Sequence, residues 1–313
     1  MIKSYTWHII VAMLFVLCCP EIGIAADKSI SIRKSAKKCL AGEASYCERP
    51  AAAAFAKKKY KRSFKLDKAG CDGGNLGNCN RLASHYIDGL SVDKNHAQGV
   101  LLLDTACKSD HADSCQDLAL MYMAVAGEYR NIELGETILT GLCLKDYVTS
   151  CHLLGGLYQT GKYLAKNTAQ ALFYYQRGCD LGDPEICALA GYLYVTADEL
   201  NRDPRRGVSI LELACTAKAN LACYSLAVIY SAGTGVEKDQ NKAVKYADLG
   251  CVGLDKGSCF TAGLLYFEDS WQGRDLNKSM ERFSKSCEAG HRDGCRFSKT
   301  VKKIIKKAPK KKK

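Results

Sequence analysis

The chain has 313 residues and a formal net charge of +12, with hydrophobic residues making up 47% of the sequence. This length suffices for two compact domains or for one elongated array. A membrane-spanning class is excluded, because the longest apolar run, near the N-terminus, is too short for a comfortable span.

The first 26 residues have the features of a secretory signal peptide. Lys3 precedes an apolar run that reaches Leu17, and the small residues "GIAA" follow. We expect cleavage after Ala25 or Ala26, and therefore an exported protein that is periplasmic or secreted. Cleavage at Cys19 with lipid anchoring is the competing interpretation.

The charge is concentrated at the two ends. Residues 27–70 carry 13 Lys or Arg against 4 Asp or Glu, and residues 299–313 carry nine lysines, so residues 71–298 are left with a net charge of −6. The tail at 299–313 is typical of a solvated, disordered end. The basic ends could also bind an anionic surface through charge alone, although no specific nucleic-acid motif is present.

The remaining cysteines follow a strict period. All sixteen form C-x7-C pairs, and from Cys71 onward the first cysteine recurs every 36 residues, whereas the interval from Cys39 to Cys71 is 32. A fixed period in this range predicts a solenoid of repeats. Residues 27–70 would then be a basic N-terminal capping repeat, and residues 71–298 would be the regular repeats.

Three columns recur when each unit is numbered from its first cysteine as position 0. Position 15 holds Tyr86, Tyr122, Tyr158, Tyr194, Tyr230 and Tyr266. Position 12 is Ala or Gly throughout, and position 28 is Gly, Ala or Ser, which predicts close helix approach at both. Apolar spacing around position 15 is helical, and a second helical run ends at the next unit's first cysteine. Each unit is therefore predicted to be an αα-hairpin.

The stretch "LAVIYSAGTGVEKDQNKAVKYADLGC" at 226–251 resembles the Sel1-like repeat, a relative of the tetratricopeptide repeat. With a cysteine pair in every unit, the chain resembles more narrowly the Helicobacter cysteine-rich protein family. The resemblance implies an all-α fold, a right-handed αα-hairpin superhelix with one disulfide per repeat. Members are commonly described as penicillin-binding proteins or weak β-lactamases.

The cysteine pairs are predicted to be structural disulfides. Position 0 ends one helix and position 8 begins the next, so the short turn brings the Cα atoms within bonding range, and export supplies an oxidising compartment. Zinc ligands favour cysteines two to four residues apart, and redox couples favour C-x-x-C, so we expect no metal and no cofactor. The expected bridges are Cys39–Cys47, Cys71–Cys79, Cys107–Cys115, Cys143–Cys151, Cys179–Cys187, Cys215–Cys223, Cys251–Cys259 and Cys287–Cys295.

The first helix of each unit has a regular face and a variable one. Positions 8, 11, 12, 14 and 15 form the predicted core, and positions 9, 10, 13, 16 and 17 vary. In the family that the chain resembles, this helix lines the concave surface of the superhelix. The candidate ligand-binding residues at the variable positions are His152, Gln159, Tyr192, Tyr224, Phe260 and Phe267.

The residues give the catalytic alternative little support. Ser31-x-x-Lys34 and Ser35-x-x-Lys38 match the first element of a serine β-lactamase, but no Lys-Thr-Gly or Ser-Asp-Asn follows. The aspartates Asp183, Asp239 and Asp293 lie at probable helix starts, where capping explains them. We therefore expect a scaffold that binds a protein, peptide or peptidoglycan-like ligand, with weak β-lactam hydrolysis as the alternative.

Overall fold

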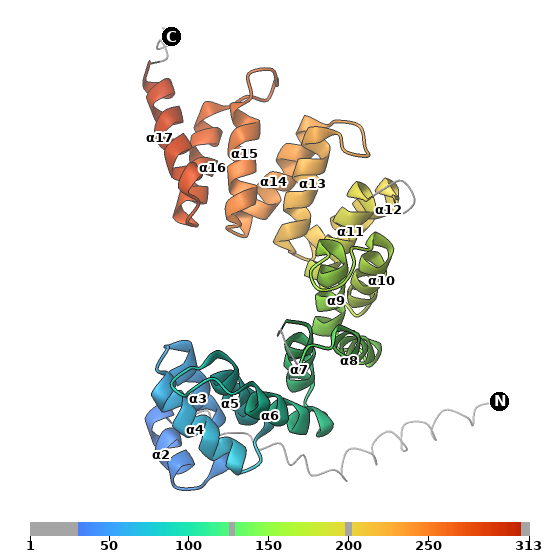
Figure 1. Cartoon of the computed structure of the whole chain (residues 1–313). Helices are drawn as coiled ribbons and strands as arrows, with labels where there is room; N and C mark the ends of the chain where they lie inside the picture. Colours follow the sequence, from blue (N-terminus) through green and yellow to red (C-terminus); the bar gives the residue numbers. More distant parts are fainter. Residues whose placement is uncertain (1–30, 125–128, 198–201, 308–313) are drawn as a thin grey trace, which may run out of the picture. The chain divides into compact units, whose positions relative to one another are not determined.

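The computed structural model of the chain describes residues 31–124, 129–197 and 202–307, and the proposed signal peptide at 1–26 lies outside these ranges. Within them the fold is all-α, with sixteen α-helices, one short 3-10 helix and no strand (Figure 1). The helices are α2 (Ile32–Leu40), α3 (Glu48–Ala56), α4 (Tyr60–Asp72), α5 (Leu76–Asp88), α6 (His96–Lys108), α7 (Ala112–Ala124), α8 (Ile132–Leu144), α9 (Val148–Thr160), α10 (Thr168–Asp180), α11 (Pro184–Thr196), α12 (Pro204–Thr216), α13 (Asn220–Ala232), α14 (Gln240–Val252), α15 (Lys256–Phe267), α16 (Leu276–Glu288) and α17 (Arg292–Lys307).

The predicted αα-hairpins are confirmed, and the cap residues show why the helices stop where they do. Gly89, Gly161 and Gly233 end first helices in the left-handed region, with φ of 71°, 74° and 74°, which glycine adopts without steric cost. Every second helix from α6 to α16 starts after an Asn or Asp whose side chain accepts from a backbone N–H of the first turn. These N-caps are Asn95, Asn131, Asn167, Asp203, Asp239 and Asp275.

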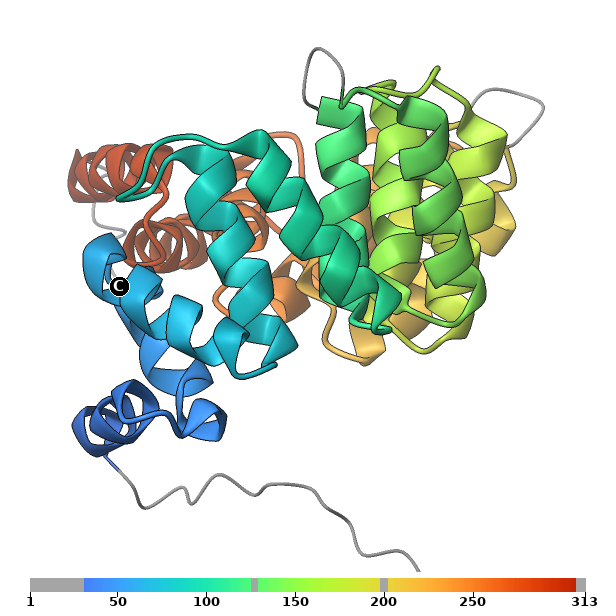
Figure 2. The same cartoon turned by 60° about the horizontal axis from the view of Figure 1, so that its bottom comes forward.

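The chain divides into two compact units, Met1–Asp117 and Leu118–Lys313. In the first unit, α4 packs against α3 and α5, and α5 packs against α6. In the second unit, the hairpins α9–α10, α11–α12, α13–α14 and α15–α16 follow one another, and each second helix from α10 to α14 also packs against the next first helix (Figure 2). No helix in the described part of the chain has the length and apolar character needed to cross a bilayer.

The small-residue columns do mark close helix approach. A Cβ on Gly191 would lie 2.9 Å from the carbonyl oxygen of Gly207, and a Cβ on Gly207 would lie 2.6 Å from that of Gly191. At Gly155 and Gly263 the space is filled by the rings of Tyr175 and Phe283 instead. Glycine is required at these positions because any side chain would push the paired helices apart.

All eight predicted disulfides are present. Each joins the end of one helix to the start of the next across the turn, with Cα–Cα distances of 4.5 to 4.8 Å. The sixteen cysteines thus serve the connections between successive hairpins.

The spacing of 32 residues between Cys39 and Cys71, four fewer than in the other units, results from a shorter loop between α3 and α4. Residues 57–59 connect α3 to α4, whereas residues 89–95 connect α5 to α6, so the first loop has three residues where the next one has seven. The loss of four residues therefore leaves the hairpin itself intact.

The first part of the lysine-rich tail, residues 299–307, is helical, and residues 308–313 lie outside the described residues. Helix α17 continues through Lys307, because Val301 is fully buried and Ile304 and Ile305 are half-buried on the same side of the helix. The lysines project from the opposite side, so the charge is carried on a helix as far as Lys307.

Candidate binding surface

The second unit exposes a row of large apolar side chains on consecutive first helices. We call Tyr192, Leu221, Tyr224 and Leu264 the apolar face; they come from α11, α13 and α15, and α13 packs against both of its neighbours. Their exposed fractions are 39%, 37%, 36% and 39%. They occupy positions 6, 9 and 13 of their units, which a helix places on one side.

Four first helices of this unit carry almost no charge, unlike the lysine-rich α17. Helices α9, α11, α13 and α15 contain two charged residues, Glu185 and Lys256, and both lie in the first turn. The second helices α10, α12, α14 and α16 carry between two and five each. Depletion of charge together with exposed aromatic residues is the composition of the core of a protein–protein interface.

Four of the predicted ligand-binding residues lie in different surroundings. Tyr192 and Tyr224 belong to the apolar face, with the Tyr224 ring lying over Gly257 of the next unit. His152 is exposed on α9, with its ring centroid 6.3 Å from that of Tyr175. Gln159 is half-buried and accepts a hydrogen bond of 2.8 Å from the Tyr175 hydroxyl, so it supports packing inside its own repeat.

The other two predicted residues, Phe260 and Phe267, are half-buried on α15. The Phe260 ring stacks on His291 at 4.5 Å and also contacts the rings of Phe283 and Phe297. These aromatic contacts pack α15 against α16 and α17, so Phe260 contributes to helix packing and does not belong to the apolar face.

The variable positions are not all free, contrary to the expectation from helical spacing. Ala188 and Val195 stand at positions 9 and 16 of α11 and are fully buried, and Ser225 at position 10 of α13 is nearly so. Ala188 and Val195 belong to one core cluster with Leu211 and Leu226 from the neighbouring helices. A helix in the middle of an array is covered by its neighbours on more than one side.

Comparison with known proteins gives this architecture its family. The Sel1 repeat model matches residues 79–111, 148–183, 186–218, 220–251 and 258–291, which together exceed half of the chain. The chain belongs to the Sel1 repeat family. A comparison with curated protein sequences finds no match. The Sel1 repeat is a helical scaffold suited to protein interaction.

Solved Sel1 repeat structures share the fold. A protective antigen of uropathogenic Escherichia coli strains, which displays this fold, is 18% identical with a TM-score of 0.59; the alignment covers 86% of the chain. The chain spans 58% of that antigen's length. A Sel1 repeat protein from Oxalobacter formigenes is 19% identical with a TM-score of 0.55, over 77% of this chain and 99% of that one.

Both Ser-x-x-Lys matches, which precede the matched Sel1 repeats, have structural roles. Ser31 is the N-cap of α2, and its hydroxyl accepts from the backbone N–H of Lys34 at 3.4 Å. Ser35 is buried, while the Lys38 ammonium donates to Glu43 at 3.1 Å. Among the described residues, no group of three or more His, Cys, Asp or Glu side chains could hold a metal ion.

Two of the three aspartates named as caps, Asp183 and Asp239, are N-caps, whereas Asp293 is not. Asp183 accepts from the backbone N–H groups of Glu185 and Ile186, and Asp239 accepts from that of Lys242. Asp293 lies in the first turn of α17, where His291 accepts from the backbone N–H of Gly294 in place of an aspartate. Its negative charge interacts favourably with the positive end of the helix dipole, and its carboxylate pairs with Arg296 at 3.0 Å.

Tyrosines of the second unit bind carboxylates of neighbouring helices. The Tyr158 hydroxyl donates to Glu136, the Tyr246 hydroxyl to Glu212 at 2.6 Å, and the Tyr266 hydroxyl to Asp248 at 2.7 Å. Burial, with the nearby carboxylate, raises the pKa of all three phenols, that of Tyr266 to about 12. They are therefore neutral hydrogen-bond donors at physiological pH.

Sequence reasoning missed a buried polar network in the first unit. The Asp67 carboxylate, fully buried, accepts from Ser63 at 2.7 Å, Asn78 at 2.9 Å and Arg81 at 3.0 Å, and lies 3.5 Å from Nε2 of buried His85. The signal was present in the sequence. Asp67 lies four residues before Cys71, the first cysteine of the next unit. At the same position, the later units have no acidic residue but Leu103, Leu139, Tyr175, Leu211, Ala247 and Phe283.

A cavity of about 500 Å³ on the outer side of α10 was also missed. Phe173, which is 54% exposed, lines it with Tyr194, Gln176 and Arg177. The exposed phenylalanine next to the paired tyrosines in "ALFYYQ" was the available signal.

Proposed function

We propose that this chain is an exported, disulfide-stapled Sel1 repeat scaffold that binds a protein or peptide segment through the apolar face of α11, α13 and α15. The carrying observation is the composition of that face: four large apolar side chains stand exposed on helices whose only charges are Glu185 and Lys256. Burying such a surface costs little polar desolvation.

Export is supported by the cysteines. Eight disulfides persist only in an oxidising compartment, such as the periplasm or the extracellular space, because cytosolic thiols are kept reduced. The N-terminal 26 residues have the composition of a cleavable signal. Both point to a protein that acts outside the cytoplasm.

The chemistry of the face selects the ligand class. Tyr192 and Tyr224 offer flat rings with hydroxyl groups, and Leu221 and Leu264 offer aliphatic contact. A peptide segment with two or three apolar or aromatic side chains fits this surface, whereas a peptidoglycan fragment would require polar groups for its hydroxyl and amide groups.

A displayed peptide library selected on the oxidised protein tests the proposal. The affinity of the recovered peptides is then measured for two double variants. Y192A/Y224A removes two rings from the apolar face, and L213A/L249A removes two exposed leucines, 72% and 48% exposed, from the second helices α12 and α14. We expect Y192A/Y224A to weaken binding by about 30-fold, as for two residues at the centre of an interface, and the control by less than about twofold.

Two outcomes would contradict this proposal. Equal loss in both variants would indicate non-specific hydrophobic capture. Recovery of muropeptides, but of no peptides, by the same protein would assign the face to a cell-wall ligand.

Weak β-lactam hydrolysis, as described for the resembling Helicobacter family, remains the alternative function. With a chromogenic cephalosporin we expect the same background turnover from the wild type and from S31A/S35A, since Ser31 caps α2 and Ser35 is buried. Turnover that this double variant abolishes would favour the hydrolase.

A further inference from the structure

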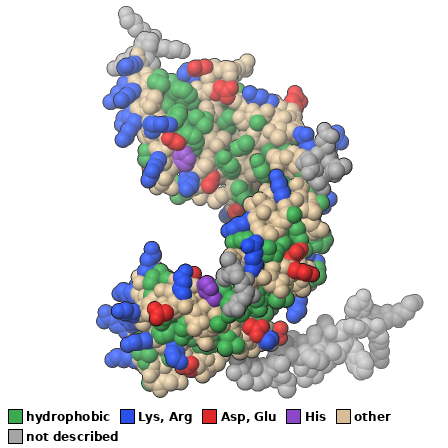
Figure 3. Space-filling view, in the orientation of Figure 1, with side chains coloured by type: hydrophobic (Ala, Val, Ile, Leu, Met, Phe, Trp, Pro, Cys, Tyr) green, Lys and Arg blue, Asp and Glu red, His purple; other side chains and the backbone are tan. Residues whose placement is uncertain are grey.

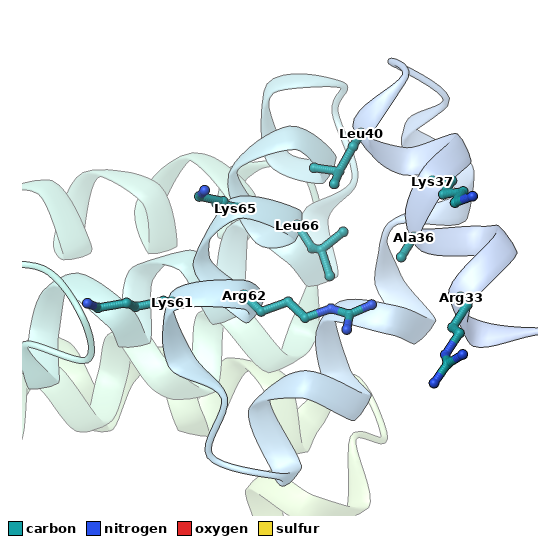
Figure 4. A pocket seen from close by; sticks show the side chains of 8 residues that line it. All are labelled: Arg33, Ala36, Lys37, Leu40, Lys61, Arg62, Lys65 and Leu66. Atoms are coloured by element: carbon teal, nitrogen blue, oxygen red, sulfur yellow. The ribbon is translucent and has the colours of Figure 1, made fainter.

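The first unit contains a cavity between α2 and α4, and every ionisable residue that lines it is a lysine or an arginine. Its volume is about 540 Å³, within the range of small-molecule sites. The lining residues are Arg33, Ala36, Lys37, Leu40, Lys61, Arg62, Lys65 and Leu66 (Figure 4). No acidic and no aromatic side chain is among them.

A second cavity, of about 270 Å³, adjoins the first and adds Lys57 and Lys59 to its walls. Arg33 and Arg62 line both cavities, so the two guanidinium groups stand where the cavities meet. In Figure 4, Arg62 reaches from α4 toward α2, which carries Arg33, whereas Lys61 and Lys65 point away from α2.

Three acids of this unit are engaged elsewhere. Glu43 pairs with Lys38, Asp72 with Lys68, and Asp67 is enclosed in its buried network. Within the described part of the chain, the cations that line the cavity form no ion pair with a carboxylate. Figure 3 shows Lys and Arg side chains gathered over these N-terminal helices. Such a cluster repels itself until an anion enters.

We propose that this cavity binds the phosphorylated headgroup of an anionic phospholipid. Two guanidinium groups that line one cavity match the oxygens of one phosphate better than they match a single carboxylate. Leu40, which is 61% exposed, together with Ala36 and Leu66 provides an apolar wall for the first carbons of the lipid. This site lies in the first unit and does not depend on the apolar face of the second.

The lining also argues against other polyanions. Single-stranded nucleic acid is held by aromatic stacking platforms, and the lining has no aromatic ring. An acidic peptide would use the cations but would leave the exposed Leu40 without a hydrocarbon partner. A lipid headgroup uses both the cations and the apolar wall.

Vesicle co-sedimentation tests the site directly. The oxidised protein is titrated with phosphatidylcholine vesicles that contain or lack phosphatidylglycerol, at constant ionic strength. R33Q/R62Q is compared with K34Q/K58Q, which removes the same charge from exposed positions of the same unit that line neither cavity. All four side chains are exposed, so the fold is retained, as far-UV circular dichroism will verify.

We expect binding that requires phosphatidylglycerol and falls about tenfold or more in R33Q/R62Q, but less than about threefold in K34Q/K58Q. Equal losses would show attraction by net charge alone and would overturn the site. Polyglutamate and soluble phosphatidylglycerol are compared as competitors of vesicle binding. If polyglutamate displaces the protein equally well, the ligand is an acidic protein and not a lipid. Binding to glycerol 3-phosphate alone, with no vesicle binding, would overturn the membrane source.

Discussion

The close contact between α11 and α12 provides the sharpest test of the repeat architecture. Replacing Gly207 by alanine would place a methyl group 2.6 Å from the backbone oxygen of Gly191 and 2.7 Å from Cγ2 of Val195. A side chain can rotate away from such a contact, but a backbone oxygen cannot. The two helices must therefore separate or tilt.

The magnitude follows from two opposing terms. Overpacking a close-packed core costs about 1–3 kcal/mol, and an alanine in a helix interior recovers about 0.5–1 kcal/mol relative to glycine. Because the nearest atom to the new methyl is backbone, we expect the upper part of the first range and a net destabilisation of about 2 kcal/mol for G207A.

Gly141 on α8 is the matched control. It is also a helix-interior glycine in the second unit, but a Cβ there would meet nothing within 4 Å. G141A should therefore show only the helix-propensity term and stabilise the protein by about 0.5–1 kcal/mol. The same substitution would thus change stability in opposite directions at the two sites.

Urea unfolding of the oxidised proteins, followed by far-UV circular dichroism, measures both variants. The urea concentrations at the unfolding midpoints are compared only if the dependence of the unfolding free energy on urea concentration is unchanged. A change in that dependence would indicate that the repeat array no longer unfolds cooperatively. A G207A variant as stable as the wild type would refute the close-contact reasoning. So would a G141A variant that is destabilised as much as G207A.

Three further measurements examine the other interactions that hold the fold. D67N should destabilise the first unit by about 3 kcal/mol, because it leaves a buried polar network without its charge, whereas D72N, at an exposed carboxylate, should change stability by less than about 0.5 kcal/mol. The free energy of unfolding of C251S/C259S should be lower by about 2.5 kcal/mol, because the disulfide no longer restricts the unfolded chain by closing a short loop. An unchanged free energy of unfolding would show that this disulfide does not stabilise the fold. The folded pKa of Tyr266, about 12, exceeds the ordinary value of about 10, so its contribution is complete below pH 10 and is lost as the pH rises to 12. The free energy of unfolding should fall more steeply with pH in this window for the wild type than for Y266F.

The fold was predictable because each of its rules repeats. A period of 36 with paired cysteines determines the hairpin and the disulfides, and the columns at positions 12 and 28 predict the close approach seen at Gly191 and Gly207. The caps were predictable for the same reason, since an Asn or Asp at one position of every unit can only serve a local role.

The candidate site was less predictable, because exposure depends on what the neighbouring units place there. Helical spacing puts Ala188, Tyr224 and Phe260 at the same position 9. Yet the first is buried in the core, the second is exposed, and the third is covered by Phe297 of α17 and by His291, which precedes that helix. The 36-residue period determines where a residue lies along its helix. Residues of the neighbouring repeat determine whether that residue is buried or exposed.

The location of the disulfides explains why an apolar face can be exposed without loss of stability. Each staple lies in a turn between hairpins, and the core of the second unit is formed by residues such as Leu211, Leu226 and Tyr246. Tyr192 and Tyr224 are not members of that core cluster, and more than a third of each residue is exposed. The repeat thus separates the residues that keep it folded from those available for binding. The Y192A/Y224A variant should therefore lose its partner while it unfolds at nearly the same urea concentration as the wild type, and a large drop in stability would place these rings in the core instead.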